Sequence, residues 1–281
     1  MNLSLSYFQF QQGIPLKLID LFQHWSNFDD KEKLQIEIYN EILIKSKLKV
    51  HDKEIIIPSK SYHFSFIKHL IRLLEKENEQ VNELIYDYSS FLLNENEDYF
   101  YKRYSISNST SILLKEDKFL ISNGTTGLRT WQASLRMIEY LQENPDIIKN
   151  KSILEIGSGI GLLGITLSKF HIKNITLSDV HDSVLSLLEG NVELNQLNLD
   201  IKRLDWNNYK EKDLLNYDVM IGSDVAYDPS LATILASFIG QFLRLNSKSQ
   251  VWLACTLRNE ETFQIFQNSL GKQHIMFYHL I

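Results

Sequence analysis

The spacing of apolar residues changes along the chain, from a helical period to a strand-like one. Before residue 98, apolar side chains recur at three- and four-residue steps, which is typical of helices with one buried face. The clearest stripe consists of Phe64, Ile67, Ile71 and Leu74, and similar steps occur at 15–28, 31–48 and 81–92. Pro58 with Ser59 marks a break between two helical segments. We therefore expect residues 1–98 to form a helical region, which could help to dock a substrate.

Short strand-like runs replace the helical pattern between residues 99 and 122. They are Tyr101 to Ile106, Ser111 to Leu114 and Lys118 to Ile121, and polar residues separate them. Alternating or short apolar runs between polar turns are typical of strands. We expect a small β-hairpin over 99–122.

Beyond Gly127 the runs alternate between strand and helix. Strands are expected at 152–156, 174–178, 218–222 and 250–255, and helices at 128–143, 161–170, 182–195, 230–245 and 263–270. Strands separated by helices predict a parallel sheet that is covered on both faces. Residues 123–281 are therefore expected to form one α/β domain.

Composition and charge exclude several classes of protein. Apolar residues make up 44% of the chain, which is ordinary for a globular protein. The net charge of −6 argues against direct nucleic-acid binding, and no apolar run is long enough for a membrane helix. Residues 1–13 do not resemble a secretory signal, and the single cysteine, Cys255, excludes an internal disulfide. We expect a cytoplasmic protein in which Cys255 is a buried, inert thiol.

A glycine-rich loop follows the strand expected at 152–156. The sequence from Glu155 to Gly161 reads Glu-x-Gly-x-Gly-x-Gly, and a helix is expected next. Glycines let the backbone approach a ligand closely, and the start of a helix offers free N–H groups. Asp179 ends the next strand, where a carboxylate can accept hydrogen bonds from two ribose hydroxyls. The pattern predicts a site for a nucleotide-like ligand.

Three interpretations of this loop have to be weighed. Residues Gly159 to Gly164 also match the dinucleotide fingerprint in a shifted register, and Asp179 suits either ligand. Glu155, two residues before the first glycine, is typical of the first motif of methyltransferases. We favour a methyltransferase loop, with a dinucleotide enzyme and a purely structural turn as alternatives.

Four further segments carry a resemblance to a known family. They are Thr125 to Ala133, Leu204 to Trp206, Ser223 to Tyr227 and Thr256 to Thr262. In this order they resemble the seven-strand protein lysine methyltransferases, whose D-x-x-Y motif would be Asp224 to Tyr227. The resemblance covers 123–271 and implies a Rossmann-like sheet. The family adds a strand beyond the run at 275–280, so it stays open whether the last strand is missing here.

The resemblance also implies a cofactor, a substrate and their binding residues. The cofactor would be S-adenosylmethionine, and the substrate would be a lysine of a protein, with elongation factor 2 expected. Asp224 and Tyr227 would face the lysine as catalytic residues. The expected cofactor-binding residues are Trp131, Glu155, Gly157, Ser158, Gly159, Asp179, Trp206 and Ser223.

The chemistry explains why such residues would be needed. A lysine must be neutral to accept a methyl group, yet the pKa of free lysine is near ~10.4. A dry, aromatic-lined slot lowers that pKa because it disfavours the charged form. Asp224 could orient the amine, and Tyr227 could wall the slot and attract a methylated ammonium. His171 and His181 lack partners at metal spacing, so no metal is expected.

Other functions stay open at this stage. The chain could methylate another protein, RNA or a small molecule, or it could be a non-catalytic module that keeps the fold. The charge and the D-x-x-Y motif favour a protein substrate. The sequence does not indicate an oligomeric state.

Overall fold

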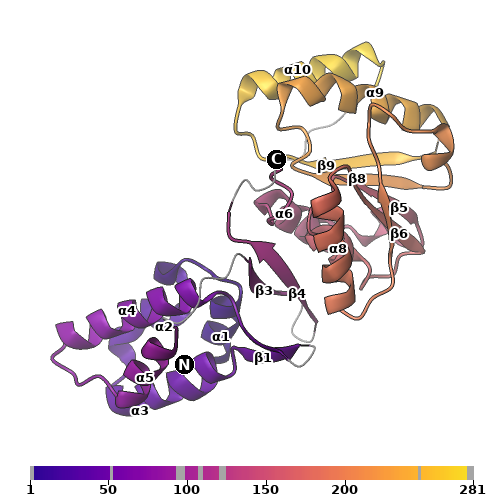
Figure 1. The fold of residues 1–281 in the computed structure, drawn as a ribbon. Helices are drawn as coiled ribbons and strands as arrows, with labels where there is room; N and C mark the ends of the chain where they lie inside the picture. Colours follow the sequence, from indigo (N-terminus) through magenta and orange to yellow (C-terminus); the bar gives the residue numbers. More distant parts are fainter. Residues whose placement is uncertain are drawn as a thin grey trace. The chain divides into compact units, whose positions relative to one another are not determined.

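The computed structural model describes residues 3–50, 53–92, 99–106, 110–119, 125–245 and 248–276. The chain divides into two compact units, residues 1–119 and residues 120–281. The first unit is mainly helical and includes two antiparallel strand pairs, whereas the second contains a parallel sheet (Figure 1). Among the described residues, no helix is both long and apolar enough to cross a membrane.

Short helices build the first unit around one apolar core. Phe10, Ile38, Phe66 and Ile85 come from four of these helices and are completely buried in it. The hydroxyl of Ser59 accepts a hydrogen bond from the backbone N–H of Tyr62 and caps the longest helix of this unit, which begins after the expected break at Pro58, although the segment before Pro58 is a strand. The helical elements are α1 (Leu3–Gln11), η1 (Leu16–Leu18), α2 (Asp20–Gln23), η2 (Trp25–Asn27), α3 (Lys31–Ile38), η3 (Tyr39–Ile44), α4 (Lys60–Lys76) and α5 (Glu83–Phe91).

The helix expected over 31–48 ends earlier than predicted. Residues Tyr39–Ile44 form a π-helical turn, and the chain then enters β1 (Lys47–Val50), which pairs antiparallel with β2 (Lys53–Ile56). The segment Lys-Leu-Lys-Val alternates polar and apolar residues, which favours a strand once the chain can turn and pair. The prediction was wrong here because the short alternation directly follows a helical pattern.

The predicted hairpin near residue 100 is confirmed. Strands β3 (Tyr99–Ser105) and β4 (Ser111–Asp117) pair antiparallel, with Tyr99 opposite Asp117 and Ser105 opposite Ser111. The buried hydroxyl of Tyr104 donates a hydrogen bond of 2.6 Å to Glu116 Oε1 across the pair. Of the strand expected at 118–121, residues 118 and 119 form a bend after β4, and residues 120 and 121 lie outside the described residues.

The second unit is an α/β domain of the expected class. Its described strands form one parallel sheet in the order β7-β6-β5-β8-β9. The strands are β5 (Ser152–Ile156), β6 (Asn174–Asp179), β7 (Asp200–Arg203), β8 (Val219–Ser223) and β9 (Gln250–Ala254). The helical elements are α6 (Gln132–Glu143), η5 (Pro145–Ile147), α7 (Leu162–Leu167), α8 (Asp182–Leu194), η6 (Glu211–Asp213), α9 (Pro229–Leu245) and α10 (Glu260–Lys272).

Helices cover both faces of this sheet (Figure 1). One face packs against α9 and α10 through residues such as Leu154, Met220, Phe238 and Phe266. The strand order reverses at β5, whose neighbours β6 and β8 lead away in opposite directions. In open α/β sheets, ligands bind at the carboxyl ends of the strands at such a reversal. The topology therefore places the expected ligand site at the ends of β5, β6 and β8.

The run at 275–280, expected to form a further strand, is only partly described. Ile275 and Met276 belong to no strand, and residues 277–281 lie outside the described residues.

Candidate active site

An open cavity lies at the carboxyl ends of the central strands, and its empty volume is about 990 Å³ including its mouth. Five segments of the second unit line it. They lie within residues 125–134, 157–162, 179–181, 204–207 and 223–234. Seven of the eight expected cofactor-binding residues are on its wall: Trp131, Gly157, Ser158, Gly159, Asp179, Trp206 and Ser223. Both expected catalytic residues, Asp224 and Tyr227, also line it.

The loop after β5 lies so close to its neighbours that glycine is required. Gly157 and Gly159 have φ angles of 58° and 54°, in the left-handed region that side chains disfavour. A Cβ at Gly159 would lie 3.0 Å from the carbonyl oxygen of Gly127, which contributes to the same cavity wall. Ser158 fixes the loop, because its N–H donates to Ser178 O at 2.8 Å and its Oγ accepts from Ser178 N at 2.9 Å. The loop therefore presents bare backbone to the cavity.

Asp179 holds a carboxylate at the rim of the cavity. Its Oδ2 accepts a hydrogen bond from Gly159 N at 3.1 Å, and its Oδ1 accepts from Val180 N at 2.8 Å and His181 N at 3.2 Å. A carboxylate has about four acceptor positions, so one is left for a hydroxyl group of a ligand. The chemistry of this wall, with glycines beside a fixed carboxylate, suits a nucleoside.

Trp206 contributes an aromatic surface to the cavity wall, in the segment that follows β7. The indole packs against the core of the second unit, with its ring centroid 6.3 Å from that of Phe238. It also lines the cavity, so one part is buried in the core and another faces the ligand space. This position is suited to contact with a flat base.

Glu155 differs from the other expected cofactor-binding residues, because it does not line the cavity. It lies in the middle of β5, is 1% exposed, and its Oε2 has no hydrogen-bond partner within the described part of the chain. Burial raises the pKa of its carboxyl group to about 8. Glu155 therefore lies beneath the loop and cannot touch a ligand in the cavity directly. The prediction that it contacts the cofactor is corrected to a supporting position.

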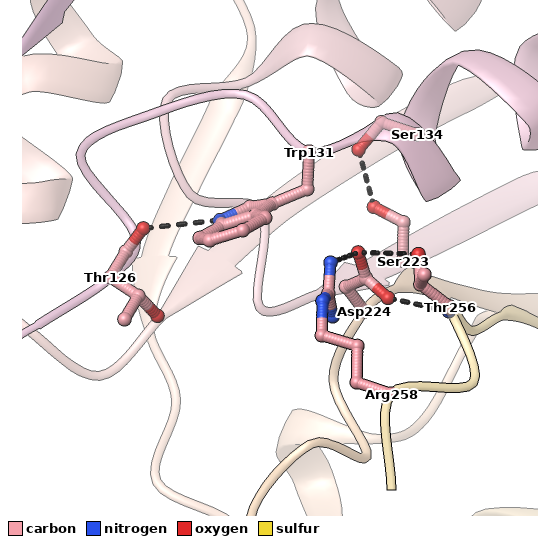
Figure 2. Close-up of polar contacts among 7 residues, drawn as sticks. All are labelled: Thr126, Trp131, Ser134, Ser223, Asp224, Thr256 and Arg258. Carbon is pink, nitrogen blue, oxygen red and sulfur yellow. Dashed lines mark hydrogen bonds and ion pairs between the residues drawn. The ribbon is translucent and has the colours of Figure 1, made fainter. Parts of the chain in front are cut away.

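Trp131 lies on the wall because the expected helix over 128–143 begins only at Gln132. Trp131 has extended backbone angles, φ −118° and ψ 151°, and precedes α6 as its N-cap residue. Its indole Nε1 donates a hydrogen bond of 3.2 Å to Thr126 O, which fixes the ring (Figure 2). Near the same point, the hydroxyls of Ser134 and Ser223 lie 2.6 Å apart and join α6 to the end of β8.

A second hollow adjoins the cavity. The two share Thr126, Trp131, Asp224 and Tyr227 in their walls, and the second hollow continues along residues 255–263 after β9. These four shared residues therefore lie at the junction between the cavity and the second hollow. Among the described residues, no group of three or more histidine, cysteine or acidic side chains is placed to hold a metal ion.

Asp224 is the most constrained residue at this junction. It is 8% exposed and has a φ angle of 53°, which is uncommon for a residue with a side chain. Its Oδ1 accepts from Thr256 N at 2.7 Å, and its Oδ2 accepts from Thr256 Oγ1 at 3.1 Å and from Arg258 Nη2 at 2.9 Å (Figure 2). Such conformations cluster at functional sites. Tyr227, by contrast, is 53% exposed on the outer wall.

Sequence reasoning missed the role of Thr256 and Arg258 and misjudged Cys255. The segment 256–262 carried the family resemblance, but no pattern indicated that its side chains turn back onto Asp224. Cys255 was expected to be buried in a strand, but β9 ends at Ala254 and Cys255 is exposed in the wall of the second hollow.

Comparisons with known proteins agree with this geometry. A family model described as lysine methyltransferase matches residues 107–272. The protein-lysine N-methyltransferase EEF2KMT of Homo sapiens is 33% identical over 241 residues, which cover 78% of this chain and 72% of that protein. The Bos taurus protein of the same name is 31% identical over 287 residues, with coverage of 89% and 83%.

Among solved structures, the fold is similar to a tRNA (uracil-54, C5)-methyltransferase of Pyrococcus abyssi in complex with S-adenosyl-L-homocysteine. The TM-score is 0.41 and the sequence identity 17%, over 63% of this chain and 38% of that chain. This likeness is too distant to support a functional inference. The family match and the two relatives, which extend over most of the chain, carry the assignment.

Proposed function

The chain belongs to the lysine methyltransferase family, and from that premise we propose that it methylates a lysine side chain of elongation factor 2. The coarser activity follows from the family: the protein is an S-adenosylmethionine-dependent protein-lysine N-methyltransferase. The particular substrate is the proposal. It rests on the motifs at 125–133 and 256–262, and it agrees with the relatives' name, EEF2KMT. A cytoplasmic location is proposed with it.

The observation that supports methyl transfer to a lysine at this site is the junction of the two hollows. Methyl transfer needs a donor and an amine that meet in line, each bound by its own surface. The cavity with the glycine loop and Asp179 suits the donor, because it offers close backbone and a fixed carboxylate. The second hollow leads to the same point from the other side, past Tyr227 and Asp224. We therefore assign the first space to the cofactor and the second to the substrate lysine.

The residues at the junction have distinct tasks. Bound S-adenosylmethionine supplies a methyl group on a positively charged sulfur, which keeps the bonding electrons when the methyl group leaves. The lysine must first lose a proton to water, since only the neutral amine has a free lone pair. Asp224 accepts a hydrogen bond from an N–H of that amine and so aims its lone pair, while the ring of Tyr227 forms the outer wall. Orientation of this kind can contribute several orders of magnitude in rate.

Labelled methyl transfer tests the function directly. Purified protein, with Asp224→Asn as the matched control, is incubated with methyl-labelled S-adenosylmethionine and either purified elongation factor 2 or a cell lysate. We expect label on elongation factor 2, at a lysine identified by peptide mapping, with the wild-type protein alone. Label on a different protein would contradict the proposed substrate. Label on RNA or a small molecule, or no label at all, would contradict protein-lysine methylation itself.

A further inference from the structure

Arg258 binds the same carboxylate that is assigned to the substrate amine. Its Nη2 lies 2.9 Å from Asp224 Oδ2, and the two form an ion pair in which the side chain of Asp224 is 6% exposed and that of Arg258 is 43% exposed. The remaining donors to Asp224 come from Thr256, two residues before Arg258. The segment after β9 therefore holds both oxygens of Asp224 (Figure 2).

The guanidinium of Arg258 also packs against Trp131, which is part of the wall of the second hollow. Its Cζ lies 4.9 Å from the ring centroid of Trp131, within the range of a cation–π contact. The indole itself is fixed through its hydrogen bond to Thr126 O. Arg258 lines the second hollow but not the cofactor cavity. Its positive charge is thus fixed on the side from which the lysine would enter.

This charge bears on a difficulty in the reaction. An unpaired carboxylate beside a lysine favours the ammonium form and raises the lysine pKa, whereas the reaction needs the neutral amine. A cation paired with that carboxylate has the opposite effect. Thr256 and Arg258 occupy three of the about four acceptor positions of Asp224, so one is left for the amine, and the ion pair offsets the negative charge.

The other ionisable groups around the slot do not replace Arg258. The second hollow is lined by four such groups, Asp224, Tyr227, Cys255 and Arg258, and the cavity adds Arg129, Asp179, His181 and Asp205. Although Cys255 is exposed as a residue, desolvation of its sulfur and the charge of Asp224 raise the pKa of its thiol to about 11, while Arg258 acts to lower it. Asp224 and Arg258 therefore have opposite effects on the pKa of this thiol.

We propose that Arg258 is a positioning residue that holds Asp224 and, through its charge, keeps the substrate lysine deprotonated in the slot. The inference rests on the proposed function, because it requires that a lysine amine meets Asp224. Arg258 does not itself touch the reacting atoms. Its action is on the protonation equilibrium of the amine, from which one proton passes to water before the methyl group is transferred.

The pH dependence of kcat at saturating substrate and cofactor tests this role, because it reports the pKa of the bound amine. Arg258→Gln removes the charge, and Arg258→Lys retains it as the matched control. We expect the acidic limb of the kcat profile to shift upward by about one pH unit or more in Arg258→Gln. The limb should stay at its wild-type position in Arg258→Lys. Cofactor affinity, measured by calorimetry, should be the same in all three proteins.

An unshifted limb in an active Arg258→Gln variant, or an equal shift in both variants, would overturn the inference and leave the proposed function intact. If the wild-type protein methylates no lysine, the proposed function fails, and this inference fails with it. Arg258→Ala is a second uncharged variant and must give the same upward shift as Arg258→Gln.

A measurement that needs no activity gives an independent test. Cys255 is the single cysteine of the chain, so the rate of its reaction with iodoacetamide at pH 9 follows its thiolate fraction. Arg258→Gln should slow this reaction severalfold, and Asp224→Asn should accelerate it. Equal rates in wild type and Arg258→Gln would show that Arg258 does not offset Asp224 in the slot and would overturn the inference.

Discussion

At Gly159, backbone conformation and space both exclude a side chain. Its φ angle is 54°, and a Cβ would lie 3.0 Å from Gly127 O. Gly159→Arg should therefore weaken S-adenosylmethionine binding by about 100-fold or more, since a strained loop and a bulky side chain both block the backbone's approach. Isothermal calorimetry measures the affinity, with Gly190→Arg as a control because nothing lies near a Cβ at that position. Unchanged affinity in Gly159→Arg would contradict the assigned cofactor cavity.

Glu155 gives a prediction about pH. Burial raises its folded-state pKa from 4.5 to about 8, so the folded protein holds a proton that the unfolded chain releases above pH 4.5. The stabilisation from this group is complete below pH 4.5 and is lost as the pH rises toward 8. Glu155→Gln keeps the shape without the ionisation, so it should gain at least about 1 kcal/mol relative to wild type between pH 5 and pH 8. If wild type and Glu155→Gln, both without ligand, give parallel curves of melting temperature against pH, this prediction is contradicted.

Individual residues of the cavity wall could be predicted from the sequence where they belong to a local motif. The glycines from 157 to 161 and Asp179 follow directly from strand–loop–strand spacing. Glu155 belongs to the same motif but is buried, and its carboxyl group lies beside Gly164 of α7 and not in the cavity wall. Arg258 was beyond such reasoning, since its contact with Asp224 joins two loops that are adjacent only once β8 and β9 pair.

Among the elements, α10 anchors the segment that holds Asp224. Its N-cap residue is Asn259, whose Oδ1 accepts hydrogen bonds from Glu261 N at 2.9 Å and Thr262 N at 3.2 Å. Arg258 directly precedes this cap. Asn259→Ala should lower the free energy of unfolding by about 1 kcal/mol and also reduce kcat, because the loop loses its fixed end. Urea denaturation and steady-state kinetics measure the two effects, and loss of stability with unchanged kcat would show that the cap does not position Arg258.

Element type was easier to predict than element ends. The alternation of strands and helices after residue 127 follows from long, clear patterns, and the strands expected at 152–156, 174–178, 218–222 and 250–255 are present. The short strand β7 ends at Arg203, directly before Leu204 to Trp206, where the family resemblance places the end of a third strand, although its four residues carry little apolar signal. The helix expected from residue 128 begins at 132, because Trp131 has an extended backbone and its indole is hydrogen-bonded to Thr126 O.

For the whole molecule, the division into two units suggests a division of tasks. Every residue that lines the two hollows lies in residues 125–281, so the first unit is not needed to form them. Deleting residues 1–119 should spare S-adenosylmethionine binding but lower methylation of elongation factor 2 at least about tenfold, because a folded substrate needs contacts beyond the lysine slot. Full activity of the truncated protein toward that substrate would contradict a docking role. Loss of cofactor binding in a folded truncated protein would contradict the independence of the second unit.

In the proposed reaction, Asp224 acts on the substrate amine and not on the cofactor. Asp224→Asn is the sharpest change, because asparagine tolerates the left-handed backbone better than alanine and keeps the side chain's shape while removing its charge. The decisive measurement is kcat for lysine methylation by this variant, with the cofactor dissociation constant determined on the same protein. We predict that kcat falls by about 100-fold while cofactor affinity stays within about twofold of wild type. Near-normal kcat, or a loss of kcat explained by weaker cofactor binding, would contradict an action of Asp224 on the substrate amine.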